Sequence, residues 1–339
     1  MDRRLMLKYL AGSAMLAGFR AHAAPDAVST IIRINIPGPN MLPYLPIELI
    51  PRLGLDKALG AQLAIRYMPS GVLALDDAVA GNGDFAGVGF SVLPNFVAKG
   101  KSVAAVATLS SGVPPYSILI RPDLVKTVRE VRHLKGRSIG IPLGSLTSKT
   151  YLQTMMELWL SAHGVRRTDV RWVQTNQNLD GMYGALASGV VDAVFCEEPL
   201  AGTLVRKKVG RRLASLNEPR APGRESWAKH LRAVLAAPRE IIDIHPRRVE
   251  LMVGMLQRSL RWIHKHKAAE IVAKLGIQDA ELSLDLADPL KNMSDLYSLD
   301  GRFKPAELES TQAFIVASGA PLPAGVTMRS LIADQWVNR

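Results

Sequence analysis

The sequence predicts an α/β protein built of two units, with the second unit inserted into the first. Strand-like and helix-like segments alternate from residue 31, and a second alternation starts near residue 116. Beyond residue 212 the chain becomes loop-rich and then offers one more strand and long helices. Such alternation predicts doubly wound parallel sheets with helices on both faces. A chain of 339 residues, 48% of them hydrophobic, is long enough to form two cores.

Residues 1–23 are predicted to be a cleavable signal peptide. A charged start is followed by an apolar stretch and by Ala21-His22-Ala23, so cleavage is expected before Ala24 and the protein is expected in the periplasm. The pair Arg3-Arg4 also resembles a twin-arginine signal, and both export routes stay open.

The first unit is predicted to span residues 24–112 and the inserted unit residues 113–214. Strand-like segments of the first unit lie at 31–36, 62–68, 85–90 and 102–109, with helical segments at 45–55, 73–82 and 91–100. In the second unit, strand-like segments lie at 116–123, 133–143, 170–175 and 192–196, with helical segments at 147–164 and 178–189.

Residues 215–339 are predicted to return to the first unit. They begin with a loop-rich stretch, continue with a strand at 231–238, and then form a long amphipathic helix from Pro246. Val249, Met252, Leu256 and Leu260 give this helix one apolar stripe.

Composition excludes several function classes. The net charge is +12, and removing the +3 carried by residues 1–23 leaves +9. The densest basic run, residues 206–212, contains no aromatic side chains, so a solvated basic face is favoured over a nucleic-acid site. No later stretch approaches the roughly 18 apolar residues of a membrane helix. Cys196 is the sole cysteine, so no internal disulfide can form, and we expect it in the core.

No motif predicts a nucleotide, a catalytic residue, a cofactor or a metal. Ser148-Lys149-Thr150 resembles the end of a phosphate-binding loop, but Ser148 and Leu143 occupy the two positions that require glycine. His264 and His266 are two residues apart on a predicted helix and therefore point to different faces.

A ligand-binding function is the interpretation that remains, because small polar residues follow nearly every predicted strand. Ligands of open α/β sheets lie beyond the carboxyl ends of the strands, where these residues would gather. Each of them alone could simply cap a helix, whereas together on two facing units they predict a polar cleft. The predicted ligand-binding residues are Asn40, Ser70, Gly71, Ser91, Ser110, Ser111, Gly144, Ser145, Thr147, Ser148 and Glu197.

Three segments resemble the periplasmic solute-binding proteins of ABC importers, specifically the nitrate, taurine, aliphatic-sulfonate and thiamine-pyrimidine (NMT1-like) branch. LKGRSIGIPLGS (134–145) is similar to that branch's LKGKKIGVPxGS segment. ALASGVVDAVFCEEPLA (185–201) is similar to its ALxxGxVDAxxxWEP segment. The helical stretch 245–277 is similar to a third family segment, and the three occur in family order.

The resemblance implies a type II fold of two lobes, joined by a hinge with two crossovers, that close on a solute. It places Ser70, Gly71, Ser91, Ser110, Ser145 and Thr147 where family members line the cleft. It also implies a monomeric receptor, without enzymatic activity, that delivers a small polar organic solute to a membrane permease. A thiamine-pyrimidine-synthase-like enzyme and a receptor for a membrane signalling partner are the alternatives.

Glu197 departs from the family pattern. It stands where the branch often has tryptophan, one residue before Glu198-Pro199. A carboxylate in place of an aromatic ring would change the pocket from stacking to recognition of a cation or a hydrogen-bond donor. An amine-bearing or heterocyclic solute is therefore favoured over nitrate or a simple alkanesulfonate.

Overall fold

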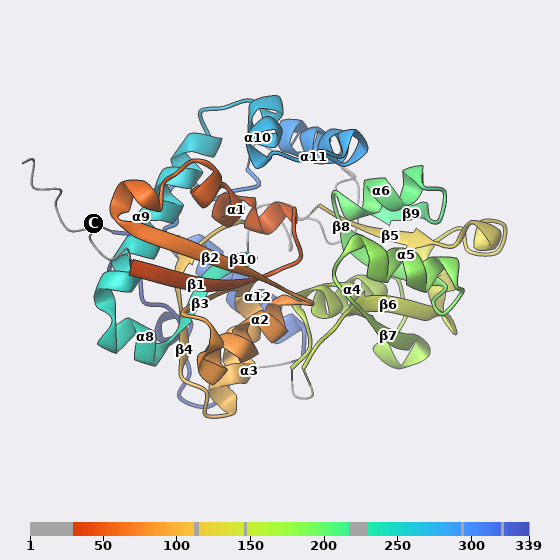
Figure 1. Ribbon diagram of the computed structural model, residues 1–339. Coiled ribbons are helices and arrows are strands. Elements are labelled where there is room, and N and C mark those ends of the chain that lie inside the picture. The colour runs from red at the N-terminus through yellow and green to blue at the C-terminus, as the bar shows by residue number, and fades with distance from the viewer. Residues whose placement is uncertain are drawn as a thin grey trace, which may run out of the picture.

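The computed structural model describes residues 30–111, 115–145, 148–216, 230–292, 295–319 and 322–338. The predicted signal peptide lies outside these residues. Two five-stranded sheets, each covered by helices, form two lobes that lie side by side (Figure 1).

The first lobe is built on a sheet of order β2-β1-β3-β10-β4. Its strands are β1 (Thr30–Pro37), β2 (Ala61–Met68), β3 (Phe85–Gly89), β4 (Val103–Thr108) and β10 (Ala233–Pro238). Its helices are α1 (Leu45–Arg52), α2 (Gly71–Asp77), α3 (Leu93–Ala98), α8 (Arg239–Ile244), α9 (Pro246–Ile263), α10 (Ala268–Leu275), α11 (Ala280–Asn292) and α12 (Pro305–Ala317).

The second lobe is built on a sheet of order β7-β6-β8-β5-β9. Its strands are β5 (Tyr116–Ile120), β6 (Ser138–Pro142), β7 (Arg171–Thr175), β8 (Ala193–Glu197) and β9 (Arg211–Ser215). Its helices are α4 (Tyr151–Ala162), α5 (Leu179–Ala187) and α6 (Leu200–Arg206).

The chain passes from the first sheet to the second between β4 and β5, and returns between β9 and β10. This is the two-lobed fold with two crossovers that the family resemblance implies. The predicted limits of the lobes, 24–112, 113–214 and 215–339, stay predictions.

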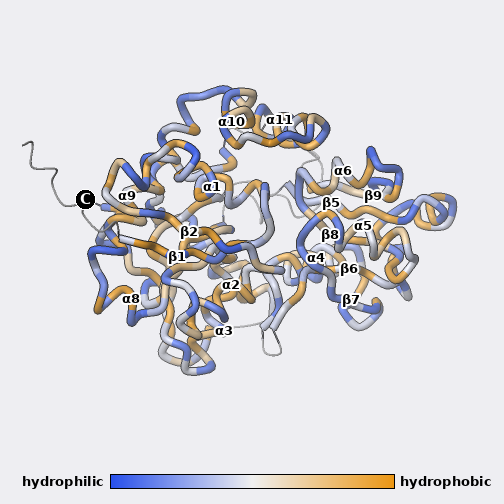
Figure 2. Tube along the Cα trace, viewed as in Figure 1, coloured by the Kyte–Doolittle hydropathy of each residue, from blue (hydrophilic) through white to orange (hydrophobic). Residues whose placement is uncertain are grey.

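The strands inside each sheet are apolar runs buried on both faces. Every residue of the inner strands β3, β5, β6 and β8 is buried, and so is every residue of the edge strand β4, whereas the edge strands β2 and β7 expose part of theirs. This is the pattern of strands covered by helices on both sides. Hydrophobic residues accordingly run through the strands and hydrophilic ones gather in the outer loops (Figure 2).

The prediction of parallel sheets was wrong in part, because both sheets are mixed. β10 runs antiparallel to β3 and β4, and β5 runs antiparallel to β8 and β9. These two strands are the ones that the chain enters directly from the other lobe. They do not follow a helix that packs back onto their own sheet, so the rule that makes such connections parallel does not apply to them.

The helix predicted from residue 147 begins later, at Tyr151. Thr150 has extended backbone angles, and its hydroxyl accepts a hydrogen bond from the Gln153 N–H at 3.1 Å. Thr150 is thus the N-cap, and residues 148–149 approach the helix as a loop.

Candidate functional site: a pocket between the lobes

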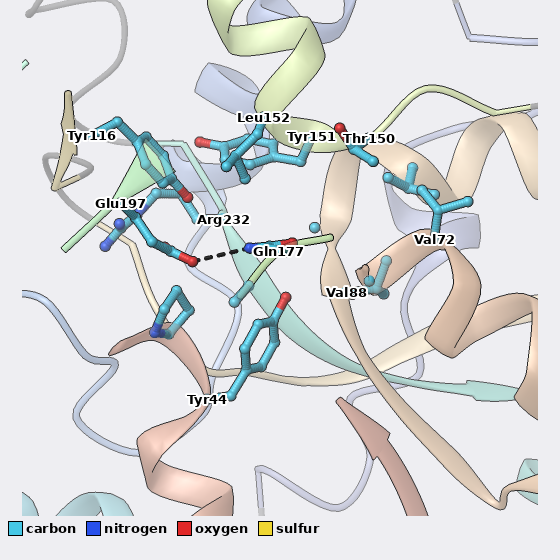
Figure 3. Close-up of a pocket in the computed structure, with 15 residues that line it drawn as sticks. Tyr44, Val72, Val88, Tyr116, Thr150, Tyr151, Leu152, Gln177, Glu197 and Arg232 are labelled. Atoms are coloured by element: carbon cyan, nitrogen blue, oxygen red, sulfur yellow. Dashed lines mark hydrogen bonds between the residues drawn. The ribbon is translucent and has the colours of Figure 1, made fainter. Parts of the chain in front are cut away.

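A pocket lies between the two sheets and takes side chains from both lobes (Figure 3). With the side chains in this arrangement its cavity volume is about 30 Å³, room for one or two water molecules. The first lobe contributes Pro43, Tyr44, Gly71, Val72, Val88, Gly89, Val92, Arg232 and Ala233. The second contributes Tyr116, Thr150, Tyr151, Leu152, Gln177 and Glu197. We call these residues the interlobe pocket.

The fold brings these residues together because most of them sit at strand ends and helix starts. Gly89 ends β3 and Glu197 ends β8, while Gly71 begins α2 and Tyr151 begins α4. The carboxyl ends of parallel strands lie at one edge of a sheet, and here the two edges face each other across the pocket.

Glu197 is the buried acid of the pocket, with only 1% of its surface exposed. Its Oε1 accepts a hydrogen bond from Gln177 Nε2 at 3.1 Å, and its Oε2 has no hydrogen-bond partner among the described residues. Burial raises the pKa of Glu197 to about 8, although Arg232, Gln177 and Tyr116 act in the lowering direction. The side chain therefore faces the pocket as a carboxyl group that is poorly solvated.

Arg232 is the buried base of the pocket and is also 1% exposed. Its Nη2 donates to the backbone carbonyls of Ser111 and Leu296. Its Nε and Nη1 have no hydrogen-bond partner, and no carboxylate lies within ion-pair distance of it, in the part of the chain that the structure describes. A guanidinium held only by carbonyl oxygens keeps a positive charge without a counter-ion in contact.

Three tyrosines supply aromatic walls and hydroxyl groups. Tyr44, Tyr116 and Tyr151 are each at most 6% exposed, and burial is the main cause that raises the pKa of each phenol. The Tyr151 hydroxyl lies 2.7 Å from His230 Nε2. Figure 3 shows Tyr44 on one side of the Glu197–Gln177 pair and Tyr116 and Tyr151 on the other. All three remain neutral hydrogen-bonding groups at neutral pH.

The lobes touch around the pocket. The Gln177 backbone N–H donates to the Pro69 carbonyl at 3.1 Å, and Lys99 Nζ lies 3.3 Å from Ser148 Oγ. A Cβ added to Gly89 would lie only 2.6 Å from the Cβ of Tyr151 in the other lobe. On the far side, Asp285 of α11 bonds Thr203 and Arg206 of α6. These contacts describe a closed arrangement of the two lobes.

Of the residues predicted from the sequence, Gly71 and Glu197 line the interlobe pocket. Ser70 lies beside Gly71 and caps α2, its hydroxyl accepting from the Leu73 N–H at 3.3 Å. Ser110 and Ser111 support the pocket from behind, because Ser110 bonds the backbone of Ala233 and the Ser111 carbonyl accepts from Arg232.

The other predicted residues do not line the pocket. Asn40 adopts a φ of 60° and donates its N–H to Glu48, and Ser91 lies in a one-turn helix after β3. Gly144, Ser145 and Ser148 belong to a tight loop closed by backbone bonds between Ser145 and Ser148. Thr147 lies outside the described residues. Whether any of these residues contacts a solute stays a prediction.

Sequence reasoning missed Arg232, Gln177 and the three tyrosines. Each belongs to a stretch that looks like an ordinary strand, helix or loop, so no local pattern marks it. Tyr116 and Tyr151 also pack against each other, with ring centroids 6.1 Å apart. A buried arginine next to a strand, in a chain with 42 basic residues, carries no signal in sequence.

Glu198, which matches the family acid, has a structural role. It accepts from the Gly202 N–H at 2.8 Å and from Arg212 at 2.7 Å, and so ties the start of α6 to β9. Cys196 is buried in β8, as predicted. His264 and His266 bond the backbone carbonyls of Ser298 and Trp262.

One serine motif is an exception to the expectation that no motif predicts a catalytic residue. Residues 136–140 read G-x-S-x-G, the spacing around the nucleophile of many hydrolases. That nucleophile sits on a sharp turn between a strand and a helix, whereas Ser138 is the first residue of β6. Its hydroxyl donates to Asp192 Oδ2 at 3.0 Å, and it is not among the pocket residues. The serine of this motif therefore has a structural role, because its hydrogen bond links the start of β6 to the residue that precedes β8.

The described residues contain no group of three or more His, Cys, Asp or Glu side chains that could hold a metal ion. Within the same residues, no helix is both long and apolar enough to cross a membrane.

The fold and the pocket together define a two-lobed protein of the periplasmic-binding-protein fold. The profile of the NMT1-like family matches residues 43–277, and the chain belongs to this family. The predicted family and fold are thus confirmed. Among curated proteins, none is similar enough in sequence to be matched.

Solved structures share the fold at low sequence identity. The alkanesulfonate-binding protein SsuA from Xanthomonas axonopodis pv. citri, bound to MOPS, is 17% identical with a TM-score of 0.69, covering 90% of this chain and 98% of that one. A ligand-binding component of an ABC-type import system from Staphylococcus aureus, with zinc bound, is 14% identical with a TM-score of 0.65 (91% and 98% covered). The periplasmic nitrate-binding protein NrtA from Synechocystis PCC 6803 is 12% identical with a TM-score of 0.67 (89% and 84% covered).

Proposed function

We propose that this protein is a periplasmic receptor that captures a small polar organic solute between its two lobes. The observation that carries the proposal is the interlobe pocket itself. Both lobes line it, and it presents buried polar atoms, Glu197 Oε2 and Arg232 Nε and Nη1, that have no partner among the described residues. Such atoms cost free energy unless something binds them, and a solute that closes the lobes around itself would supply the partners.

The delivery step is a proposal of the same kind. Proteins of this fold include a ligand-binding component of an ABC-type import system and a periplasmic nitrate-binding protein, and this supports a membrane permease as the partner. We further propose that the receptor acts as a monomer and releases its solute unchanged. Of the residues predicted from the sequence, Gly71 and Glu197 are the ones we assign to the solute site.

Solute binding is expected to raise the melting temperature of the purified protein. A solute at about one hundred times its dissociation constant adds roughly 2.7 kcal/mol to the folded state. For domains of this size that amounts to a shift of a few degrees. The measurement is a thermal-shift screen over sulfonates, amino acids, amino-sulfonates, nitrate, pyrimidines, aromatic acids and amines.

A selective shift from one chemical class supports the receptor. Chemical conversion of the bound solute, followed by mass spectrometry, would contradict release unchanged. A flat response across all classes, with no small molecule retained by the protein in native mass spectrometry, would contradict the receptor itself.

A further inference from the structure

The interlobe pocket contains one buried acid and one buried base, and each keeps a free position. Glu197 Oε2, and Nε and Nη1 of Arg232, are without hydrogen-bond partners among the described residues. The two side chains come from opposite lobes, since Glu197 ends β8 and Arg232 directly precedes β10. Both side chains line the interlobe pocket, and the charge of Arg232 acts to lower the pKa of Glu197 against the larger effect of burial.

A buried guanidinium or carboxylate is costly unless it is paired and hydrogen-bonded, and for this reason burial favours the protonated form of Glu197 in the solute-free protein. A direct ion pair between them would have met this need, and the structure shows no such contact within the described residues. A solute with a single negative charge would pair with Arg232, but Glu197 would then have to stay protonated and donate its own O–H to the solute. A singly charged amine would pair with Glu197 and leave the guanidinium of Arg232 unpaired.

We infer that the solute is a zwitterion, with a protonated nitrogen bound at Glu197 and an acid group bound at Arg232. The inference rests on the proposed receptor function and specifies the class of solute that the same pocket takes. A zwitterion supplies both missing partners at once and adds no net charge to the buried site. A zwitterion is larger than the roughly 30 Å³ left between the side chains in the present arrangement, so the lobes would have to open to admit it and would then close less far, joined through the solute by one charged group from each lobe.

The tyrosines fit the cationic end of such a solute. Tyr116 belongs to β5, the strand that pairs with β8 at Glu197, and its ring lies 6.1 Å from that of Tyr151. Aromatic faces attract cations, and the attraction grows when water is excluded. A cationic nitrogen at Glu197 would thus meet a carboxylate and neighbouring aromatic rings on the side of the pocket formed by the second lobe.

The test compares probes that differ in a single charge. The zwitterions are β-alanine, γ-aminobutyrate and taurine; the acids without an amine are propionate and ethanesulfonate; the amine without an acid is propylamine. Affinities are measured by calorimetric titration of the purified protein. At least one zwitterion is expected to bind about tenfold or more tighter than its matched acid and than propylamine, because each charged contact contributes that much.

Two variants test which end of the solute binds at Glu197 and which binds at Arg232. Glu197→Gln keeps an oxygen that can accept from Gln177 but cannot ionise to pair with a cation. It should therefore weaken binding of the zwitterion about ten- to hundredfold and leave binding of the matched acid unchanged. Arg232→Gln should weaken both. For Glu197→Gln the readout is the ratio of zwitterion to acid affinity, and for Arg232→Gln it is the ratio of acid to propylamine affinity, which should fall; a general loss of structure alters neither ratio. Should Arg232→Gln fail to fold, Arg232→Lys, which keeps the charge but not the forked geometry, replaces it and should also weaken both.

Matched controls lie outside the pocket. Glu48→Gln removes another buried carboxyl, which accepts from the Asn40 N–H, and Arg248→Gln removes an arginine paired with Asp84. Both should leave the affinities and their ratio unchanged.

The outcomes separate the inference from the proposed function. Equal affinity for a zwitterion and its matched acid, or an unchanged ratio in Glu197→Gln, would overturn the zwitterion and leave a receptor for anions. Tight binding of a nitrogen base without an acid group would overturn it in favour of a cation receptor. Absence of binding by every probe would overturn the zwitterion, and only a flat response in the broader screen as well would overturn the receptor.

Discussion

Replacing Gly89 by leucine is expected to weaken solute binding by about a hundredfold or more while both lobes stay folded. Gly89 lies at the end of β3, where an added Cβ would come within 2.6 Å of the Tyr151 Cβ and 3.0 Å of its Cγ. The backbone of Gly89, with φ of −69° and ψ of 130°, accepts any L-residue. A side chain there would therefore hold the lobes apart without straining the strand, and a solute bound by one lobe loses the charged contacts of the other.

Gly184→Leu is the control for this change. Gly184 lies inside α5, and a Cβ there meets nothing within 4 Å outside its own helix. Affinity is measured by calorimetric titration with the compound that gives the largest thermal shift, and urea unfolding checks the fold. If Gly89→Leu bound that compound as tightly as the wild type, closure of the lobes would not be part of binding.

The stability of the solute-free protein is expected to fall as the pH rises from about 5 to 8. Burial raises the pKa of Glu197 from the ordinary 4.5 to about 8, and that of Glu48 to about 7. In both cases the folded state holds a proton that the unfolded chain has released. The resulting stability is fully present below pH 4.5 and is lost as the pH rises through the folded-state values, at about 1.4 kcal/mol per pH unit for each group.

The two glutamine variants separate the contributions. The free energy of unfolding is measured by urea titration at pH 5, 6, 7 and 8. Relative to wild type, Glu197→Gln should gain stability steadily up to pH 8, whereas Glu48→Gln should gain it only up to about pH 7. A constant difference between wild type and Glu197→Gln across this range would show that Glu197 is ionised in the folded state throughout.

Much of the fold could be predicted because most of the buried strands are continuous apolar runs. The segments between them show the periodicity of helices. β3, β4, β6 and β8 all fall where the sequence places them. The antiparallel direction of β5 and β10 could not be predicted, since it follows from the route between the lobes and not from any property of the strands. The start of α4 could not be predicted, because several hydroxyl residues before it could each have capped the helix. The backbone angles of Thr150 identify it as the cap.

The site could be predicted only in part, for a related reason. The rule that ligands lie beyond strand ends led to Gly71 and Glu197, both of which line the pocket. The same rule cannot tell a residue that faces the other lobe from one that caps a helix, as Ser70 does. Arg232 and Tyr151 become pocket residues only when the second lobe folds against the first, and this is a property of the tertiary structure.

A crystal structure of the protein with the compound that gives the largest thermal shift would show directly where the solute binds. We expect the compound between the lobes, with a nitrogen at Glu197, an acid group at Arg232, and contacts from both lobes. The compound bound anywhere else, or bound between the lobes without contact to Glu197 and Arg232, would contradict this expectation.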